Sequence, residues 1–423
     1  MKRAFIVFMA FVLISTGSFS QEPSDQLPYP AGRDENTITA VSVTGLKRTK
    51  PHVVEGPLQI FIGRDAGSLD KNEVIAIIQA TGVVEPLTIE IEDNQDGNGK
   101  TLAITARDKW SIFPVPFFGI SQSGWSAGGA FMNTNFLGRK DMLMVTGSGG
   151  TGGWMANAMY FHSPDMVGEF GWSATGMFLW QDKENVDQTN KRVLRRYNSM
   201  TINPSVGVSY KLTDLFTPTF GIAYKGVLLR DTDNPVNAPE KDMHGITFSP
   251  AIGIKHNTWD GYFLNEQSAS LKYDYTLVIG GPDVHTISLN GTYNYSFIPG
   301  FRIMAKSAII LGTPSGSPFF EASPINASVN ILPQTYSAVD YSSLSIELEK
   351  SLYKFKWGLI SISAGYQIVY SNSESLRNQF DHGPVAMAHL FLNRVAIPAI
   401  GLGGSYNVSK NAWQYAFNVG MNF

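Results

Sequence analysis

Three short motifs in the sequence contain the residue types of known chemical sites. GWSAG (124–128) matches the G-x-S-x-G pattern, in which Ser126 would be the nucleophile of a hydrolase. GSGGTG (147–152) matches a phosphate-binding glycine loop, and DNQDGNGK (93–100) resembles half of a calcium-binding loop. Each motif needs a particular surrounding structure before it can carry out this chemistry.

The surroundings of these motifs favour strands and turns. A nucleophile elbow joins a strand to a helix, whereas Ser126 lies in an alternating stretch that predicts a strand. No helical pattern follows GSGGTG to offer its N-terminus to a phosphate, so a turn between strands is the favoured interpretation. DNQDGNGK lacks the bidentate acid of a calcium loop, and its Asp-Gly and Asn-Gly pairs favour a hairpin turn.

The histidines and the basic cluster give no better candidates. The 7 histidines have no metal-ligand spacing, and His382 and His389 fall on opposite faces if one strand holds both. The absence of cysteine excludes disulfides and thiolate metal sites. Arg192, Arg195 and Arg196 are interpreted as a solvated outer loop, with a contact to lipopolysaccharide phosphate as the alternative. We therefore expect no catalysis, no cofactor and no metal.

The N-terminal segment MKRAFIVFMAFVLISTGSFSQ has the pattern of a secretory signal peptide. Lys2 and Arg3 give it a positive start, residues 4–14 form its apolar core, and we expect cleavage between Ser20 and Gln21. No later stretch has about 18 consecutive apolar residues, so the sequence predicts no membrane-spanning helix. Without cysteine, a lipoprotein anchor at the cut is excluded.

The composition of the mature chain is typical of a β-barrel. Removal of Lys2 and Arg3 from the 32 basic residues leaves 30 against 35 acidic residues, and this mild acidity argues against nucleic acid as a partner. The 26 Phe, 17 Tyr, 8 Trp and 41 Gly suit aromatic girdles and closely packed strands. The mean hydropathy of −0.05 is near neutral, as expected when half of each strand faces a lumen.

The mature chain divides into a leader, a small domain and a long β-rich region. Residues 21–36 are polar and contain three prolines, so they form a flexible leader. Residues 37–108 predict a small α+β domain with the order strand, helix, helix, strand, strand, over residues 38–46, 47–58, 68–82, 88–93 and 100–108.

Residues 109–423 predict a transmembrane antiparallel β-barrel. In residues 413–423 (WQYAFNVGMNF) the odd positions are large and apolar, and the even positions are small or polar. Residues 285–297 and 360–370 alternate in the same way. We count about sixteen candidate strands, and leave about 12–14 open as alternatives, since a single-chain barrel needs an even number.

The connections between these strands differ in length. The predicted turn at residues 298–300 is tight, whereas residues 182–196, 231–242 and 312–340 read as long polar loops. Short turns on the periplasmic side and long loops outside are typical of outer-membrane barrels. We therefore place the long loops at the cell surface.

The small domain and its exit resemble a known family. SVTGLKRTK (42–50), ITARDKWSIFPVPFF (104–118) and GGAFMNTNFLGR (128–139) together resemble a POTRA domain and the start of the barrel in the BamA/TamA surface-antigen superfamily. The matching positions are the POTRA–barrel junction at Asp108, Lys109 and Trp110, and the turn after the second strand at Asn135, Phe136, Leu137 and Gly138. The resemblance spans almost the entire mature chain.

Two features of the superfamily differ in this sequence. A single POTRA-like module precedes Trp110, whereas assembly factors of this family usually carry several. The Val-Arg-Gly-Phe-type loop motif, which packs inside the barrel in relatives and matters for their activity, is missing from residues 312–340. The resemblance therefore implies the fold more firmly than it implies an insertase activity.

The resemblance implies a protein that assists insertion or translocation of other proteins at the bacterial outer membrane, with its N-terminal domain in the periplasm. Client strands would add to the POTRA sheet edge and to a labile barrel seam. Pro114 and Pro116 donate no ladder hydrogen bonds and would weaken the first strand. The predicted seam residues are Ile112, Pro114, Pro116, Phe417, Val419, Met421 and Phe423.

Outer-membrane lipid is the expected surrounding of the barrel, and unfolded outer-membrane proteins and periplasmic or lipoprotein accessory factors are the expected partners. The alternative is a passive channel or surface-exposed barrel that retains a vestigial POTRA domain. A third class, an outer-membrane enzyme such as a lipase, would need an acid–His–Ser set at one rim, and the sequence offers no convincing one.

Overall fold

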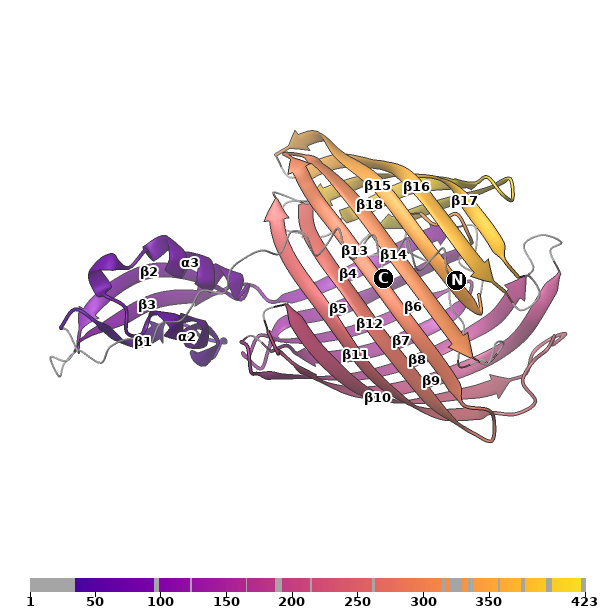
Figure 1. The fold of residues 1–423 in the computed structure, drawn as a ribbon, viewed down its shortest axis with the longest axis horizontal. Helices are drawn as coiled ribbons and strands as arrows, with labels where there is room; N and C mark the ends of the chain where they lie inside the picture. Colours follow the sequence, from indigo (N-terminus) through magenta and orange to yellow (C-terminus); the bar gives the residue numbers. More distant parts are fainter. Residues whose placement is uncertain are drawn as a thin grey trace.

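A computed structural model describes residues 35–419 with short gaps, and it contains a small α+β domain followed by a β-barrel (Figure 1). The residues left undescribed within this range are 95–98, 122–123, 165, 187–191, 214, 261–262, 314–316, 318, 320–328, 334–335, 337, 357, 374–376 and 393–397. The predicted signal peptide with Ser20 and Gln21, most of the leader, and the seam residues Met421 and Phe423 lie outside the described residues.

The N-terminal domain is a three-stranded sheet with two helices. Strand β1 (Ile38–Thr44) pairs in parallel with the central strand β3 (Lys100–Asp108), and β2 (Val84–Asp93) pairs antiparallel on the other side of β3. Helices α2 (His52–Leu58) and α3 (Lys71–Ala80), with the short 3-10 turns η1 (Gln59–Phe61) and η2 (Ala66–Ser68), connect β1 to β2. This is the predicted β-α-α-β-β order.

The first helix is shorter than predicted. Residues 47–50 form a loop, and α2 begins only at His52, directly after Pro51. Proline has no backbone N–H and its fixed φ suits the start of a helix, so the boundary falls where Pro51 stands. Helix α3 begins after Asp70, whose side chain accepts a hydrogen bond from the N–H of Asn72 (2.8 Å).

Alternation along β3 builds the core of this domain. Leu102, Ile104 and Ala106 are buried, whereas the residues between them are only partly buried. The buried face packs against the helices, where the core continues with Val53, Val54, Leu58, Phe61, Val74 and Ile78. One apolar face on the sheet and one apolar stripe on each helix are enough to close this small domain.

The barrel contains sixteen antiparallel strands and is closed by pairing of its last strand with its first. The predicted strand number is confirmed. The strands are β4 (Ile112–Ser121), β5 (Gly124–Phe136), β6 (Asp141–Gly150), β7 (Gly153–His162), β8 (Phe170–Val186), β9 (Val193–Tyr210), β10 (Phe216–Arg230), β11 (Met243–Asp260), β12 (Phe263–Ile279), β13 (Val284–Ile298), β14 (Phe301–Thr313), β15 (Asp340–Phe355), β16 (Gly358–Asn372), β17 (Gln379–Leu392), β18 (Pro398–Asn407) and β19 (Ala412–Val419).

The barrel wall is apolar outside and polar inside. In β15, Ile346 and Leu348 are 45% and 47% exposed, whereas Glu347 and Glu349 between them are 4% and 0% exposed. The neighbouring strand β16 repeats this order, with exposed isoleucines outside and buried serines inside. A soluble protein buries its apolar side chains and exposes its polar ones, so this outer wall suits an apolar surrounding.

The two ends of the barrel differ in their connections. The N-terminal domain lies at the end where β4 begins (Figure 1), and β13 and β14 are joined there by a tight turn with Gly300 at φ +75°. The two longest connections, from Arg230 to Met243 and from Thr313 to Asp340, start and finish at the opposite end, so the long connections share one end as predicted. The described part of the chain contains no helix long and apolar enough to cross a membrane.

One predicted loop is largely strand. Residues 182–196 were expected to form a polar outer loop, but β8 extends to Val186 and β9 begins at Val193. The extension is held by cross-strand polar contacts, which include Arg196 with Glu184 (3.0 Å) and Asn198 with Asp182 (2.6 Å). Charged pairs opposite each other stabilise a hairpin without apolar alternation, which is why the hydrophobic pattern did not reveal it.

Candidate functional site

The carboxylate of Asp108, at the end of β3, organises the junction between the two domains. Its Oδ2 accepts hydrogen bonds from the N–H groups of Lys47 (2.7 Å) and Arg48 (3.0 Å). Its Oδ1 accepts from the N–H (2.8 Å) and the hydroxyl (2.5 Å) of Thr49. Burial raises the pKa of Asp108, but the Thr49 hydroxyl and the three N–H groups outweigh it and lower the pKa to about 2.

The same loop binds the barrel turn that follows the second barrel strand. The hydroxyl of Thr49 accepts a hydrogen bond from Asn135 Nδ2 (2.7 Å), and both residues are buried. The N–H of Lys50 donates to the carbonyl of Gly138 (2.8 Å). Asn135 also accepts the N–H of Lys140 (2.9 Å), which fixes the turn itself. One hydroxyl therefore connects the end of the small domain to the barrel.

Gly138 is required by this close approach. Its φ is +71°, and a Cβ at this position would lie 2.0 Å from the carbonyl oxygen of Arg48. No other residue fits a left-handed backbone and this space together. The neighbouring Leu137 also has a positive φ, of 56°, and its side chain is exposed.

The other predicted junction residues have different surroundings. The N–H of Lys109 donates to the carbonyl of Val83 (2.9 Å), and Trp110 is 70% exposed. Phe136 packs edge-to-face on Tyr160 of β7, with ring centroids 6.1 Å apart. The structure thus brings Asp108, Asn135 and Gly138 to one place, through Thr49, which the sequence analysis did not single out.

The described residues contain part of the barrel seam. Strand β19 pairs with β4 through four residue pairs, from Ala416–Ser121 to Val419–Phe118. The adjacent pairings of the same strands run from Ile400–Val419 to Asn407–Ala412 and from Ile112–Asn133 to Ser121–Gly124. In the described residues the pairing of β4 with β19 ends at Phe118, and the residues that follow Val419 lie outside the described part of the chain.

The predicted seam residues divide between two strand pairs. Phe417 and Val419 lie opposite Ile120 and Phe118 across the seam. Ile112, Pro114 and Pro116 lie opposite Asn133, Phe131 and Gly129 of β5. A direct contact between Ile112 and Val419 is ruled out by the register, because Ile112 lies six residues, or about 20 Å, along β4 from the partner of Val419.

Part of the loop between β14 and β15 packs inside the barrel. Ile331, Leu332 and Tyr336 are buried, and they share a core with wall residues that include Val369 and Val385. In this sequence the loop lies within the 312–340 segment that lacks the family motif. The buried side chains of its described part are apolar, and they pack against side chains of the barrel wall.

Polar groups of β16 and β18 hold this loop. Gln367 accepts the N–H of Ile331 (2.9 Å) and donates to the side chain of Asn330 (3.1 Å). Ser405 donates to the carbonyl of Asn330 (2.8 Å), and Tyr336 shares a hydrogen bond with Ser371 (2.7 Å). These contacts satisfy the backbone of a buried loop, which is otherwise costly.

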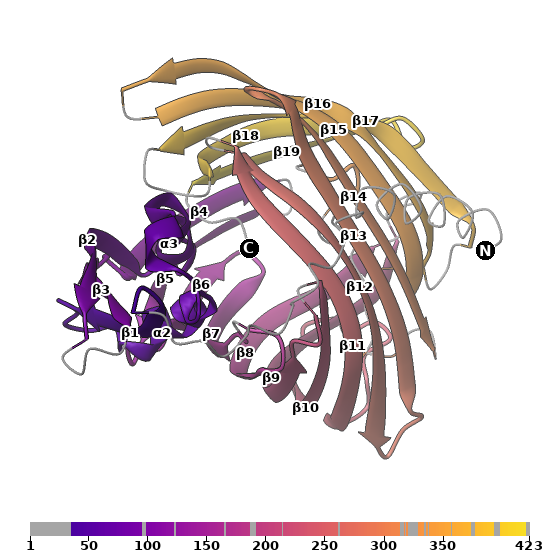
Figure 2. The ribbon, with the colours of Figure 1, turned by 60° about the vertical axis from the view of Figure 1, so that its left-hand side comes forward.

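The lumen is unequal on its two sides. Figure 2 shows the wall of β15–β19 facing the wall of β7–β10. The first wall carries the loop, whereas a cavity of about 520 Å³ lies against the second, lined largely by small and polar residues such as Ser173, Ser205, Ser209, Thr219 and Ser249. Small side chains leave room along this wall and give it a polar lining.

The three motifs that match chemical sites lie in strands and the turns between them, two in the barrel wall and one in the N-terminal domain. Ser126 lies within β5, opposite Gly119 of β4. The next element after β5 is the strand β6, and not the helix that a nucleophile elbow needs. In GSGGTG, Gly147–Gly150 belong to β6 and the turn is limited to residues 151–152. Asp93 and Lys100 pair across the β2–β3 hairpin, and residues 95–98 between them lie outside the described residues.

The histidines of β17 face opposite sides, as predicted. The side chain of His382 is on the outer face beside Tyr366 (2.5 Å), whereas His389 lies on the inner face beside Glu349 (3.2 Å). In the described chain no group of three or more His, Asp or Glu side chains is arranged to hold a metal ion. Arg195 and Arg196 lie in β9, and Arg192 directly precedes it.

Comparison with solved structures identifies the fold. No protein-family model and no curated protein match the sequence. The crystal structure of BamA from Haemophilus ducreyi lacking POTRA domains 1-3 matches with a TM-score of 0.59 and 15% identity, covering 91% of this chain and 85% of that chain. CdiB from Acinetobacter baumannii matches with a TM-score of 0.56 and 9% identity, covering 100% and 98%.

A second CdiB, from Escherichia coli, has a TM-score of 0.55 and 12% identity, with 99% of this chain and 98% of that chain covered. The chain therefore shares the architecture of BamA and CdiB, as the resemblance implied. Identities this low establish the fold alone.

We expect D108N to weaken the junction. The amide cannot accept all four donors, and the loss should destabilise β3 and the 47–50 loop by about 1–2 kcal/mol. Because the folded pKa of about 2 lies below the ordinary 3.8, this stabilisation is complete above about pH 4 and lost as the pH falls towards 2. Hydrogen exchange on the intact protein should show faster exchange of these amides in D108N, with no change in E92Q, an exposed carboxylate on β2.

We expect G138A to separate the two domains without unfolding either. The added methyl group meets the Arg48 carbonyl and a positive φ, at a cost of about 1–3 kcal/mol. Limited proteolysis should then cut between the small domain and the barrel faster than in the wild type. The matched control is G152A, because a Cβ there meets nothing within 4 Å. Equal cleavage of both variants would contradict the assigned contact.

We expect Q367A to loosen the inner loop. The substitution leaves the buried N–H of Ile331 without this acceptor, at a cost of about 1–3 kcal/mol. Exchange of the Ile331 amide should accelerate, while the β16 ladder stays protected. S205A, on the opposite wall of the lumen, should leave that amide unchanged. Slow exchange of Ile331 in Q367A would show that the loop is held by its apolar core alone.

Proposed function

We propose that this chain is an outer-membrane β-barrel that assists insertion or translocation of proteins at the outer membrane, with its POTRA-like domain in the periplasm. The observation that carries the proposal is the combination of a closed barrel with an apolar outer wall and a small α+β domain held at the end where the seam strand β4 begins. The fold shared with BamA and CdiB supports the same general type of barrel. We further propose membership of the BamA/TamA superfamily.

The mechanism we propose is strand addition at the seam. Backbone groups without a partner are costly in hydrocarbon, so opening of the β4–β19 pairing would give an extended client strand the backbone groups of β4 as hydrogen-bond partners. Pro114 and Pro116 of β4 have no N–H and limit how tightly any strand pairs there. A client strand would bind reversibly and leave as part of its own barrel.

The N-terminal domain offers two further edges. In its sheet, β3 is central, so β1 and β2 each have one edge with no strand partner among the described residues. An extended client can pair there in the periplasm by the same backbone chemistry. The Asp108–Thr49–Asn135 contacts hold this sheet at the barrel end where the seam strand β4 begins. A client held by the domain is therefore delivered close to the seam.

A passive channel is the alternative, and the cavity along β7–β12 is the observation that favours it. A channel needs a continuous polar path and a seam that never opens. The missing loop motif is consistent with this function. The two functions make opposite predictions about a locked seam.

We expect a disulfide across the seam to abolish the proposed activity. Ile120 and Phe417 lie directly opposite each other, and the chain has no cysteine of its own, so I120C/F417C gives a single defined lock. Cells that depend on this variant should lose other barrels from the outer membrane under oxidising conditions and recover them on reduction. Outer-membrane protein levels and growth provide the measurement.

The matched control is I222C/F248C, which locks a directly opposed pair on the outer face of β10 and β11, away from the seam. It should form a disulfide with no effect on other barrels. A quantitative I120C/F417C lock that leaves growth and barrel levels unchanged would exclude seam opening and favour the channel.

A further inference from the structure

One end of the β11–β12 hairpin leaves the barrel wall. Strand β12 pairs with β13 from Thr276–Val284 to Glu266–Asn294, but its pairing with β11 continues to Asp260–Phe263. The first three residues of β12 are therefore bonded to β11 and not to β13. This separation lies at the barrel end next to the N-terminal domain, where β4 and β12 both begin.

A side chain replaces the missing ladder contact at the point of separation. Asn265 Oδ1 accepts hydrogen bonds from both the N–H and the hydroxyl of Ser296 on β13, each at 2.9 Å. The N–H of Ser296 thus has a partner although the β12 backbone has moved away. The backbone of β13 therefore keeps a hydrogen-bond partner where its pairing with β12 ends. Because either a side chain or a backbone group can fill this role, the start of β12 can take two positions.

Phe263, at the start of β12, contacts strands that are not its neighbours in the wall. Phe263 is 2% exposed and clusters with Leu359 of β16 and Phe391 of β17. Its ring lies edge-to-face on Phe391, with centroids 6.1 Å apart. Four strands separate β12 from β17 in the closed wall, so this contact passes through the lumen.

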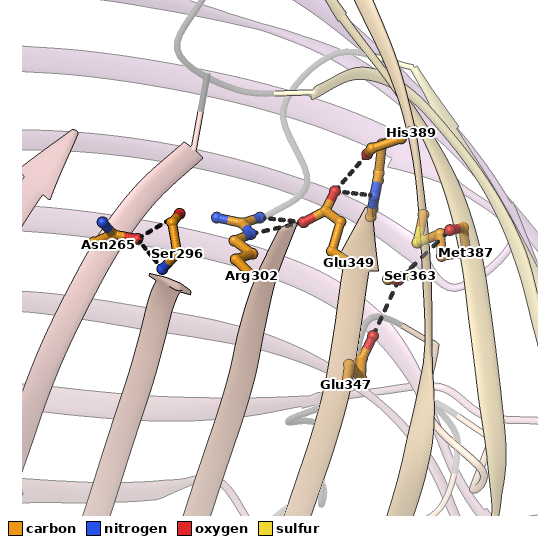
Figure 3. A network of polar contacts seen from close by, with 9 residues as sticks. Asn265, Ser296, Arg302, Glu347, Glu349, Ser363, Met387 and His389 are labelled. Atoms are coloured by element: carbon orange, nitrogen blue, oxygen red, sulfur yellow. Dashed lines mark hydrogen bonds and ion pairs between the residues drawn. The ribbon is translucent and has the colours of Figure 1, made fainter. Parts of the chain in front are cut away.

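A buried ion pair forms the platform on which Phe263 rests. The guanidinium of Arg302, on β14, lies 4.7 Å from the centre of the Phe263 ring. Glu349 Oε2 holds Arg302 through Nε (2.7 Å) and Nη2 (2.6 Å), a two-point contact that fixes the guanidinium plane. Figure 3 shows Asn265, Ser296, Arg302, Glu349 and His389 in one row.

Glu349 is itself firmly placed. It is 0% exposed, accepts the hydroxyl of Ser361 (2.5 Å), and lies 3.2 Å from Nδ1 of His389. A buried carboxylate with this many partners does not move freely. The ion pair is therefore a firmly held part of the wall, and Phe263 packs against it.

We propose that Phe263 is a latch that closes the lumen at the end next to the N-terminal domain. In the closed position Phe263 bridges the lumen to Arg302 and Phe391. In the open position the start of β12 realigns with β13, and its backbone replaces the Asn265 side chain as partner of Ser296. This movement widens the lumen at the end next to the N-terminal domain. The latch concerns the lumen, so it goes beyond the proposed seam function and holds for either proposed function.

Conductance of the purified full-length protein in planar lipid bilayers tests the latch. We expect wild type to conduct weakly and F263A to conduct severalfold more, because truncation removes the bridge. The control is F297A, the same substitution at the same end but on the outer face of β13, where Phe297 is 48% exposed. F297A should conduct like the wild type. Folded F263A with wild-type conductance would overturn the proposal.

A second variant covers the case in which F263A does not fold. F263C/F391C, in a chain without native cysteine, is bridged by a short, cleavable bifunctional thiol reagent. We expect the variant to conduct more than the wild type before bridging, less after it, and more again after cleavage. Quantitative bridging without any change in conductance would overturn the latch. Seam locking measures barrel levels in cells, so failure of the latch and failure of the proposed function are distinguishable.

Discussion

The hydrogen-bonding needs of the backbone are the constraint on which the rest of this structure depends. A barrel with an apolar outer wall must pair every strand edge, because no water reaches that wall to replace a missing partner. Each of the sixteen strands has a neighbour on both sides, and the wall closes where β4 pairs with β19. The place of closure is therefore set by where the chain enters and leaves the barrel.

The position of the N-terminal domain follows from a second set of backbone groups. The N–H groups of residues 47–49 point into one carboxylate, and Asp108 can accept them because it is the last residue of β3. These donors stabilise the ionised carboxylate of Asp108 and lower its pKa, and the Thr49 hydroxyl extends the hydrogen-bond network to Asn135. A small domain with its own core is thus held to the barrel by polar contacts, which can be broken and remade more easily than an apolar interface.

The sequence predicted the barrel because its strands alternate apolar and polar side chains. Alternation in residues such as Ile346 to Glu349 depends only on neighbours in sequence, so the strands and their number were predictable. The extended β8–β9 hairpin escaped notice because its pairs are charged. Thr49, Gln367 and Phe263 were missed for a different reason: each acts on a residue far away in sequence, and nothing in the local pattern marks it.

The two walls of the lumen divide the work of the barrel. Strands β14–β18 carry the buried ion pair, the inner loop and the aromatic cluster, all of which need fixed positions. Strands β7–β11 line the cavity with small polar residues, and contacts across the lumen come from Lys225 of β10, whose ammonium lies over the Phe319 ring, and from Phe263 of β12. The lumen is therefore most open along the cavity, because the side chains there are short, and most crowded beside β14–β18.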